Sequence, residues 1–277
     1  MTQAPTPGTK PLRSKHDLGE IVGYSYRVYA ANFLPLFALA LLTVPLQLLS
    51  GVIQQSSDAE GVQTITALLQ VPGAFVSLIV AAALVHAIHK ITGGERAAFN
   101  DALDAAFERL GALFSTTLLL VGLAFASLLA GPFLAIYWLF KKDAMIDGRR
   151  DWWLAIVPFA LLFFLAIRWA FNTQSVMVSG KQNWAALDDS ADAVRNSWWR
   201  VLGILLVVGL IVVGPTLLAQ FAVFLPPLAA AAIISAVSAV VLPFAIIAQV
   251  LLYYDLKSRT MAVPPEPVLE PLEGAPE

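Results

Sequence analysis

The sequence has no cysteine and few charged residues. The lack of cysteine excludes disulfide bonds, thiolate metal sites and cysteine nucleophiles. Charged residues make up 13% of the chain and hydrophobic residues 58%, and the mean hydropathy is +0.75, so the composition lies outside the range of soluble globular proteins. The net charge of −2 carries little information, and nothing in the sequence supports nucleic-acid binding.

The short motifs that mark common catalytic and nucleotide-binding sites are also missing. The sequence contains no H-E-x-x-H, no G-x-S-x-G, no P-loop and no G-x-G-x-x-G. His86 and His89 are three residues apart in HAIHK, a spacing that can bring two imidazoles to one helix face. No third ligand has a recognisable spacing, so we expect no metal, no cofactor and no catalytic residue.

Apolar residues are abundant and fall into six long runs. The runs cover residues 33–53, 68–91, 113–140, 152–178, 201–225 and 228–256. A bilayer core of ~30 Å needs roughly 20 apolar residues per helix, which each run provides. The sequence therefore predicts an all-α polytopic membrane bundle of six transmembrane helices. This single domain covers residues 17–260, between tails at 1–16 and 261–277 that we expect to be disordered.

Three connecting segments have the pattern of amphipathic helices. Residues 18–29, 99–110 and 184–198 carry apolar side chains every three to four positions, as interfacial helices do. In the third segment, Asp188, Asp189 and Asp192 are expected on the solvated face. Each segment leads into a long apolar run, so the chain is predicted to repeat one unit: an interfacial helix, a spanning helix, a turn and a second spanning helix. Such repeats either frame a binding site at their interface or solve a packing problem.

The distribution of lysine and arginine predicts the topology. If the N-terminus is cytoplasmic, twelve basic residues lie on the inner side and four on the outer side, which favours two cytoplasmic termini. The outer four are Lys141, Lys142, Arg149 and Arg150, all in the third loop. This loop conflicts with the rule, and a re-entrant third run broken at Gly131 and Pro132 is the alternative.

Three blocks carry a resemblance to a known family. They are DLGEIVGYSYRVYAANFLPLFALALLTVP at the start, FLAIRWAFNTQSVMVSGKQNWAALDDSADAVRNSWWRVLGILLVVGL in the middle and LLYYDLKSR at the end. Together they resemble the membrane-domain family of glycerophosphoryl diester phosphodiesterases, over roughly residues 18–259. RNSWWRVLG is shorter than the family's usual linker at this point.

This resemblance implies a membrane domain rather than an enzyme. In some relatives the domain is fused to a soluble phosphodiesterase barrel that holds the catalytic residues. Such a barrel needs on the order of 250 residues, which nothing outside the apolar runs could supply. We therefore expect a stand-alone membrane domain without intrinsic catalysis.

Arg168 is the first candidate for a functional residue. It lies in the fourth apolar run, in FLAIRWAFNTQ, followed by Asn172 and Gln174. An arginine within hydrocarbon costs several kcal/mol unless it pairs, snorkels or faces a cavity. In a continuous helix Arg168 and Asn172 would share a face and form a polar intramembrane site. The alternative is a structural pair with a carboxylate or with free backbone carbonyls.

Asp255 and Lys257 form the second candidate, at the end of the last run beside Tyr253 and Tyr254. We expect Asp255 to pair with a neighbouring base at the cytoplasmic surface rather than to act in catalysis. Gln220 and Gln249 are single intramembrane amides, which we expect to make hydrogen bonds between helices.

These observations predict a multi-pass protein of the bacterial inner membrane that organises lipid or partner proteins. Its expected partners are membrane lipids and an envelope protein, and the oligomeric state is left open. The alternative is a transporter or lipid-handling carrier with its site around Arg168.

Overall fold

The computed structural model describes residues 18–56, 60–140 and 153–260. All regular secondary structure in these ranges is helical, which confirms the predicted all-α class. The tails and the basic third loop from Lys141 to Arg150 lie outside the described residues. The predictions for them stay predictions.

The order of helices follows the predicted repeat. The first unit contains α1 (Leu18–Ala31), α2 (Phe33–Leu41), α3 (Val44–Ser56) and α4 (Glu60–Thr92). The second contains α5 (Phe99–Glu108), α6 (Leu110–Phe140), α7 (Trp153–Arg168) and α8 (Asn172–Ser179). The third contains α9 (Trp184–Val194), α10 (Trp198–Ala219), the 3-10 helix η1 (Gln220–Phe224) and α11 (Pro227–Thr260). Each unit begins with one of the three segments predicted to be amphipathic.

The long helices are apolar enough to cross a membrane. Five candidate spans lie in the described residues, and a sixth arises if α2 and α3, bent by 47°, count as one broken span. The predicted number of six is therefore the upper end of the range. α6 runs without a break from Leu110 to Phe140, so the alternative of a re-entrant break at Gly131 and Pro132 is not seen.

α11 forms the centre of the bundle. It packs against α1, α2, α3, α4, α9 and α10, and Ile247, Leu251 and Leu252 are fully buried. Gly51 permits the close approach of α3, because a Cβ at that position would lie 3.0 Å from the Cβ of Ala231. Close packing through small residues is typical of helices in membranes.

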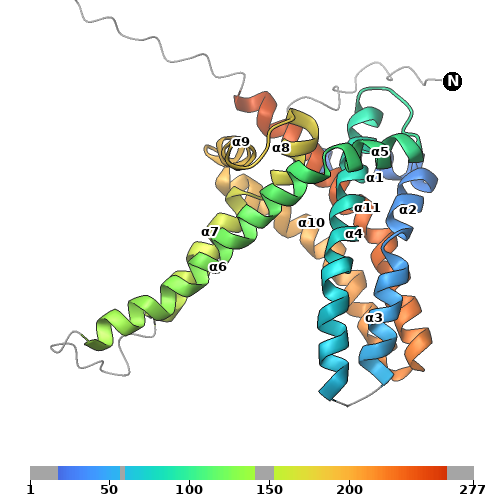
Figure 1. Ribbon diagram of the computed structural model, residues 1–277. Helices are drawn as coiled ribbons and strands as arrows, with labels where there is room; N and C mark the ends of the chain where they lie inside the picture. The colour runs from blue at the N-terminus through green and yellow to red at the C-terminus, as the bar shows by residue number, and fades with distance from the viewer. Residues whose placement is uncertain (1–17, 57–59, 141–152, 261–277) are drawn as a thin grey trace, which may run out of the picture.

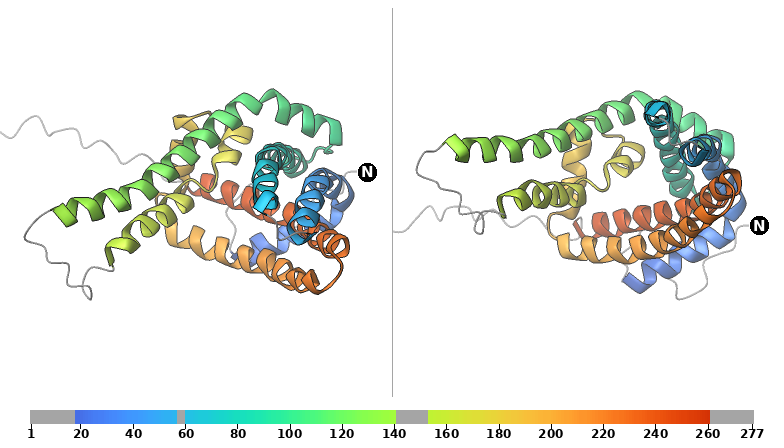
Figure 2. Two further views of the ribbon diagram at one scale, coloured as in Figure 1. Left: turned by 60° about the horizontal axis from the view of Figure 1, so that its bottom comes forward. Right: turned by 90° about the horizontal axis from the view of Figure 1, so that it is seen from below.

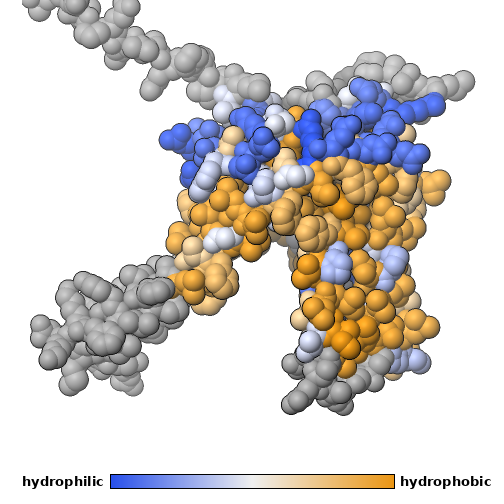
Figure 3. Space-filling model, viewed as in Figure 1, coloured by the Kyte–Doolittle hydropathy of each residue, from blue (hydrophilic) through white to orange (hydrophobic). Residues whose placement is uncertain are grey.

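Two groups of helices diverge from one end of the molecule. α2, α3, α4, α10 and α11 form one group, and α6 and α7 form a hairpin that points away from it (Figures 1 and 2). The two groups meet near the Phe75 and Phe114 rings of α4 and α6, which stack with centroids 5.3 Å apart. In the view of Figure 3, hydrophilic residues cover the end where the groups join, and hydrophobic residues cover most of the remaining coloured surface. We call this hydrophilic end, formed by α1, α5, α8, α9 and the last turns of α11, the polar platform.

Candidate functional site

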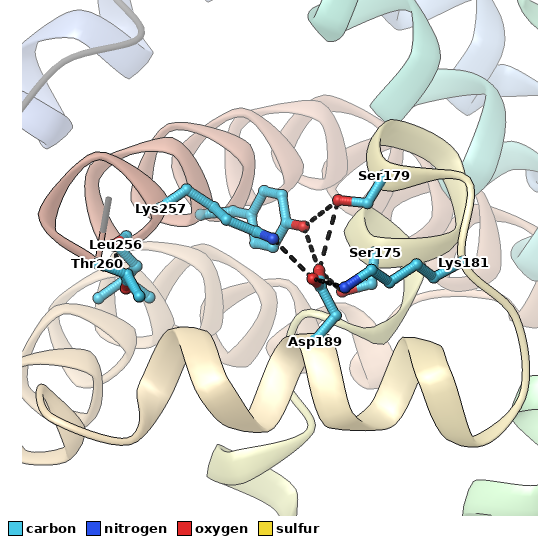
Figure 4. Close-up of polar contacts among 8 residues, drawn as sticks. Ser175, Ser179, Lys181, Asp189, Leu256, Lys257 and Thr260 are labelled. Atoms are coloured by element: carbon cyan, nitrogen blue, oxygen red, sulfur yellow. Dashed lines mark hydrogen bonds and ion pairs between the residues drawn. The ribbon is translucent and has the colours of Figure 1, made fainter. Parts of the chain in front are cut away.

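The polar platform is built around the buried carboxylate of Asp189 on α9 (Figure 4). The Nζ atoms of Lys181 and Lys257 each lie 2.6 Å from Asp189 Oδ1. The other carboxylate oxygen, Oδ2, accepts hydrogen bonds from the Tyr253 hydroxyl at 2.6 Å and from Ser175 Oγ at 3.0 Å. One carboxylate thus connects α8, α9, α11 and the loop before α9. We call these residues, together with Ser179, the Asp189 cluster.

Helical spacing brings the remaining members into place. Tyr253 and Lys257 are four residues apart on α11, and Ser175 and Ser179 are four apart on α8, so each pair shares a face. Ser179 Oγ lies 2.7 Å from the Tyr253 hydroxyl and 3.4 Å from Asp189 Oδ2. α8 ends at Ser179, and the next residue, Gly180, has a φ of +68° that favours glycine; this turn directs Lys181 back toward the carboxylate.

The cluster keeps Asp189 ionised. Burial alone would raise the pKa of Asp189, but hydrogen bonds from Lys181, Lys257, Tyr253 and Ser175 outweigh it and hold the pKa well below its ordinary value. A carboxylate saturated in this way is suited to joining helices and poorly suited to accepting a proton. The two lysine side chains remain 46% and 27% exposed, so the cluster presents an excess positive charge at the platform surface.

A second buried carboxylate, Asp255, connects α10 with the last turn of α11. Arg200 Nη2 lies 3.2 Å from Asp255 Oδ2, and Arg259 Nε lies 3.0 Å from each carboxylate oxygen. The Asp255 side chain has no exposed surface, and buried carboxylates need such partners. The prediction that Asp255 pairs with neighbouring bases agrees with this geometry. Lys257, however, pairs with Asp189, so the two members of the predicted pair belong to different clusters.

Arg109 attaches the hairpin to the platform. It stands between α5 and α6, and its Nη1 donates to the carbonyl oxygens of Val176 at 2.6 Å and Met177 at 3.1 Å. These carbonyls are in the last turns of α8, where a cation is also favoured by the helix dipole. Thr116 Oγ1 of α6 accepts a further bond, of 2.8 Å, from the backbone N–H of Asn183.

The three residues of the predicted intramembrane site do not share one continuous helix. α7 ends at Arg168 and α8 begins at Asn172, so the helical face expected for this pair is interrupted. Ser190 Oγ of α9 lies in the break, where it accepts from the N–H of Phe171 and donates to the carbonyl of Arg168, both at 3.1 Å. Arg168 therefore lies beside the amphipathic α9.

Each side chain of this predicted site has a different environment. Among the described residues, no hydrogen bond or ion pair is found for the half-buried Arg168 guanidinium. Asn172 accepts from Thr173 Oγ1 at 3.0 Å. Gln174 is buried and donates from its Nε2 to Gln249 Oε1 at 3.2 Å, the interhelical bond expected for Gln249. The cavity beside Asn172 has a volume of about 250 Å³, and Leu162, Leu165 and Trp169 are among its mainly apolar walls.

The two histidines of HAIHK do not act as a pair in this structure. His89 Nδ1 is hydrogen-bonded to the Tyr254 hydroxyl of α11, which joins α4 to the platform. In the part of the chain that the structure describes, no group of three or more histidine and acidic residues is arranged to hold a metal ion.

The prediction that all three aspartates of α9 lie on its solvated face is wrong for Asp189. Asp188 and Asp192 are exposed, whereas Asp189 is 4% exposed. One signal for this burial was present in the sequence: Ala186 and Ala193 stand three and four residues from Asp189, and small residues allow close helix packing. The partners of Asp189 could not be identified from α9 alone.

Comparisons of this chain with protein-family models, with curated proteins and with solved structures give no match. The resemblance to the phosphodiesterase membrane domain stays a prediction from the sequence.

Proposed function

We propose that this chain is a non-enzymatic scaffold of the cell envelope, which organises lipid or a partner protein between its two diverging groups of helices. The observation that carries the proposal is a pair of apolar faces that separate from the contact between Phe75 and Phe114. Beyond that contact, toward the far ends of α4 and α6, neither face is covered by the residues that the structure describes.

On α6 the uncovered face follows helical spacing from Phe114. Leu118, Val121, Phe125 and Leu128 lie four, seven, eleven and fourteen residues further along, which keeps them on the same side of the helix. Their exposed fractions are 59%, 54%, 62% and 43%. Large side chains this exposed along one face need an apolar neighbour from outside the chain.

On α4 the opposing face runs in the other direction from Phe75. Val71 and Leu68 precede Phe75 by four and seven residues, and they are 59% and 68% exposed. The hairpin and the bundle diverge in this direction (Figure 1). The space between them suits lipid chains or the transmembrane helix of another protein, both of which are apolar.

The platform supports this role by fixing the two groups at one end. The Asp189 cluster and Arg109 connect the hairpin side, through α8 and α9, to α11 in the bundle. Lysines and arginines gather at this end, which favours a cytoplasmic position for the platform at an inner membrane. The exposed excess charge of Lys181 and Lys257 favours anionic lipid headgroups there.

A carrier with its site around Arg168 has less support. The cavity beside Trp169 and Asn172 is small and has mainly apolar walls, so it offers few groups to hold a polar solute. A nanodisc preparation of Arg168→Leu tests this alternative: a lipid or solute that co-purifies with wild type and is lost from the variant would favour the carrier.

Site-specific photo-crosslinking tests the scaffold. A photoreactive phenylalanine at Phe125 faces the space between the groups, and the same residue at Leu210, 75% exposed on α10, serves as the control. In native membranes we expect a discrete adduct at position 125, identified by mass spectrometry as one protein or one enriched lipid class. Position 210 should give the bulk lipid profile. The same bulk profile at both positions would exclude an organising role for this space.

A further inference from the structure

A second, polar cavity opens at the surface of the bundle, far from the platform. Its volume is about 470 Å³, and it is formed by α3, α4, η1 and the first turns of α11. On α11 its last polar residue, Ser238, precedes Asp255 of the platform by seventeen residues, or about 26 Å of helix. The cavity therefore lies in the half of the bundle opposite to the platform.

One wall of the cavity is a polar stripe along α3 and the residue just before it. Thr43, Gln47, Ser50 and Gln54 line it, at spacings of four, three and four residues that correspond to one helical face. Thr43 is buried and Ser50 is half-buried, whereas Gln47 and Gln54 are exposed, so the stripe lies along an open side of the cavity. Gln47 Nε2 donates to Thr43 Oγ1 at 3.3 Å.

The other walls add amides and hydroxyls of the same kind. Gln70 and Ser77 of α4, Gln220 of η1 and Ser235 of α11 face the same space. In the described residues no hydrogen bond is found for the side chains of Gln70, Gln220 and Ser235. The bond between helices expected for Gln220 is therefore not formed there. In the view of Figure 3, pale hydrophilic patches interrupt the hydrophobic surface of the group formed by α2, α3, α4, α10 and α11.

The chemistry of the lining narrows the class of ligand. Unsatisfied amides within a bilayer are costly unless they line a space that holds water or a polar group. None of the residues that the structure places around the cavity is charged, so nothing there compensates a charged ligand in a low dielectric. Amides and hydroxyls both donate and accept, which matches the hydroxyl groups of a sugar or polyol. Leu46, Leu69 and Ile234 supply apolar walls for its carbon skeleton or an attached chain.

We infer that this cavity binds an uncharged, hydroxyl-rich group, as the headgroup of a neutral glycolipid or as a free sugar. This inference goes beyond the scaffold function, since the cavity is separate from the space between the hairpin and the bundle. Its volume is within the usual range of small-molecule sites, about 300–1,000 Å³.

Gly73 provides a test that leaves every hydrogen-bonding group in place. It lines the cavity, and a Cβ at this position would meet nothing within 4 Å, so Gly73→Leu places a large apolar side chain at the cavity wall from an unhindered Cβ. Leucine is also a better helix former than glycine, so the variant should fold. Gly209→Leu on α10 is the matched control, because a Cβ there is equally unhindered and the residue does not line the cavity. Gln70→Leu removes one amide at nearly constant volume.

The experiment is native mass spectrometry of the purified full chain with three probes: monoglucosyl diacylglycerol, phosphatidylserine as an anionic lipid, and free glucose. We expect wild type and Gly209→Leu to retain the glucosyl lipid. Gly73→Leu and Gln70→Leu should weaken its apparent Kd about tenfold or more, the effect of losing one good hydrogen bond or the space itself. Competition by free glucose would identify the sugar as the ligand, and lack of competition would identify the glycolipid headgroup.

Three results would overturn the inference. They are retention of the glucosyl lipid by Gly73→Leu at wild-type level, equal binding of phosphatidylserine with the same dependence on Gly73 and Gln70, and no binding of either glucose or the glucosyl lipid to the wild type. The thermal unfolding of each variant, compared with Gly209→Leu, distinguishes a blocked cavity from a misfolded chain.

Discussion

At the scale of single residues, Asp189 joins three helices and a loop of the platform through one carboxylate. Its carboxylate is buried and faces two lysines, a tyrosine and a serine from other segments. Removing one partner of a buried ionic cluster leaves the others without compensation, which costs more than the net stabilisation that the whole cluster provides. Stability should therefore depend more on this carboxylate than on its exposed neighbours.

Asp189→Asn should destabilise the protein by about 2 kcal/mol, because the buried hydrogen bonds from Tyr253 and Ser175 lose their charged acceptor and the partly exposed lysines lose their counter-ion. Asp188→Asn is the matched control. It makes the same change one residue away at an exposed position, where substitutions stay within about 0.5 kcal/mol. Thermal unfolding in detergent measures both. Equal Tm values for the two variants would show that the cluster does not stabilise the fold.

The stabilisation that Asp189 provides should also depend on pH. The pKa of Asp189 is lower in the folded state than its ordinary value of about 3.9, since its hydrogen bonds favour the charged form. Its contribution is thus complete above about pH 4 and is lost as the pH falls through the folded-state pKa. We predict that the difference in Tm between wild type and Asp189→Asn is constant near neutrality and narrows below about pH 4. A difference that grows on acidification would contradict this sign.

At the scale of elements, the amphipathic helices can be predicted from the local sequence pattern, whereas the contacts that they make cannot. Spacing of apolar residues predicts α1, α5 and α9, because the hydrophobic period is a property of the segment itself. The break between α7 and α8 was missed, since FLAIRWAFNTQ contains no proline or glycine to mark it. Ser190 of α9, nineteen residues beyond Phe171, satisfies the freed backbone there. Such a partner depends on tertiary structure.

Arg109→Ala should loosen α8, because it removes the donor to the carbonyls of Val176 and Met177. We expect faster hydrogen exchange in residues 172–179, with exchange in the α4 and α11 core unchanged. Arg96→Ala is the control, since Arg96 is exposed in the loop before α5. Unchanged exchange in α8, or an equal effect of Arg96→Ala, would exclude Arg109 as the residue that holds this helix.

At the scale of the whole molecule, the sequence predicts the membrane location and the repeat but not the divergence of the hairpin. Each apolar run is long enough to span, and this length is visible locally. Whether two spans pack together or separate depends on contacts such as that of Phe75 with Phe114, which no pattern within α4 or α6 reveals. Polar residues recur at helical spacing at positions 43, 47, 50 and 54 of the sequence. That they line a cavity depends on Gln70 and Gln220, which other helices bring to face them.

The separation of the two apolar faces is the central claim, and paired cysteines in native membranes test it most directly. The chain has no cysteine of its own, so a short bismaleimide can report only on introduced pairs. We predict that Phe75→Cys with Phe114→Cys crosslinks within one chain, because these side chains touch. Leu68→Cys with Leu128→Cys, on the diverging parts of α4 and α6, should not. Efficient crosslinking of the second pair within one chain would show that the hairpin closes onto the bundle, and it would contradict the open scaffold.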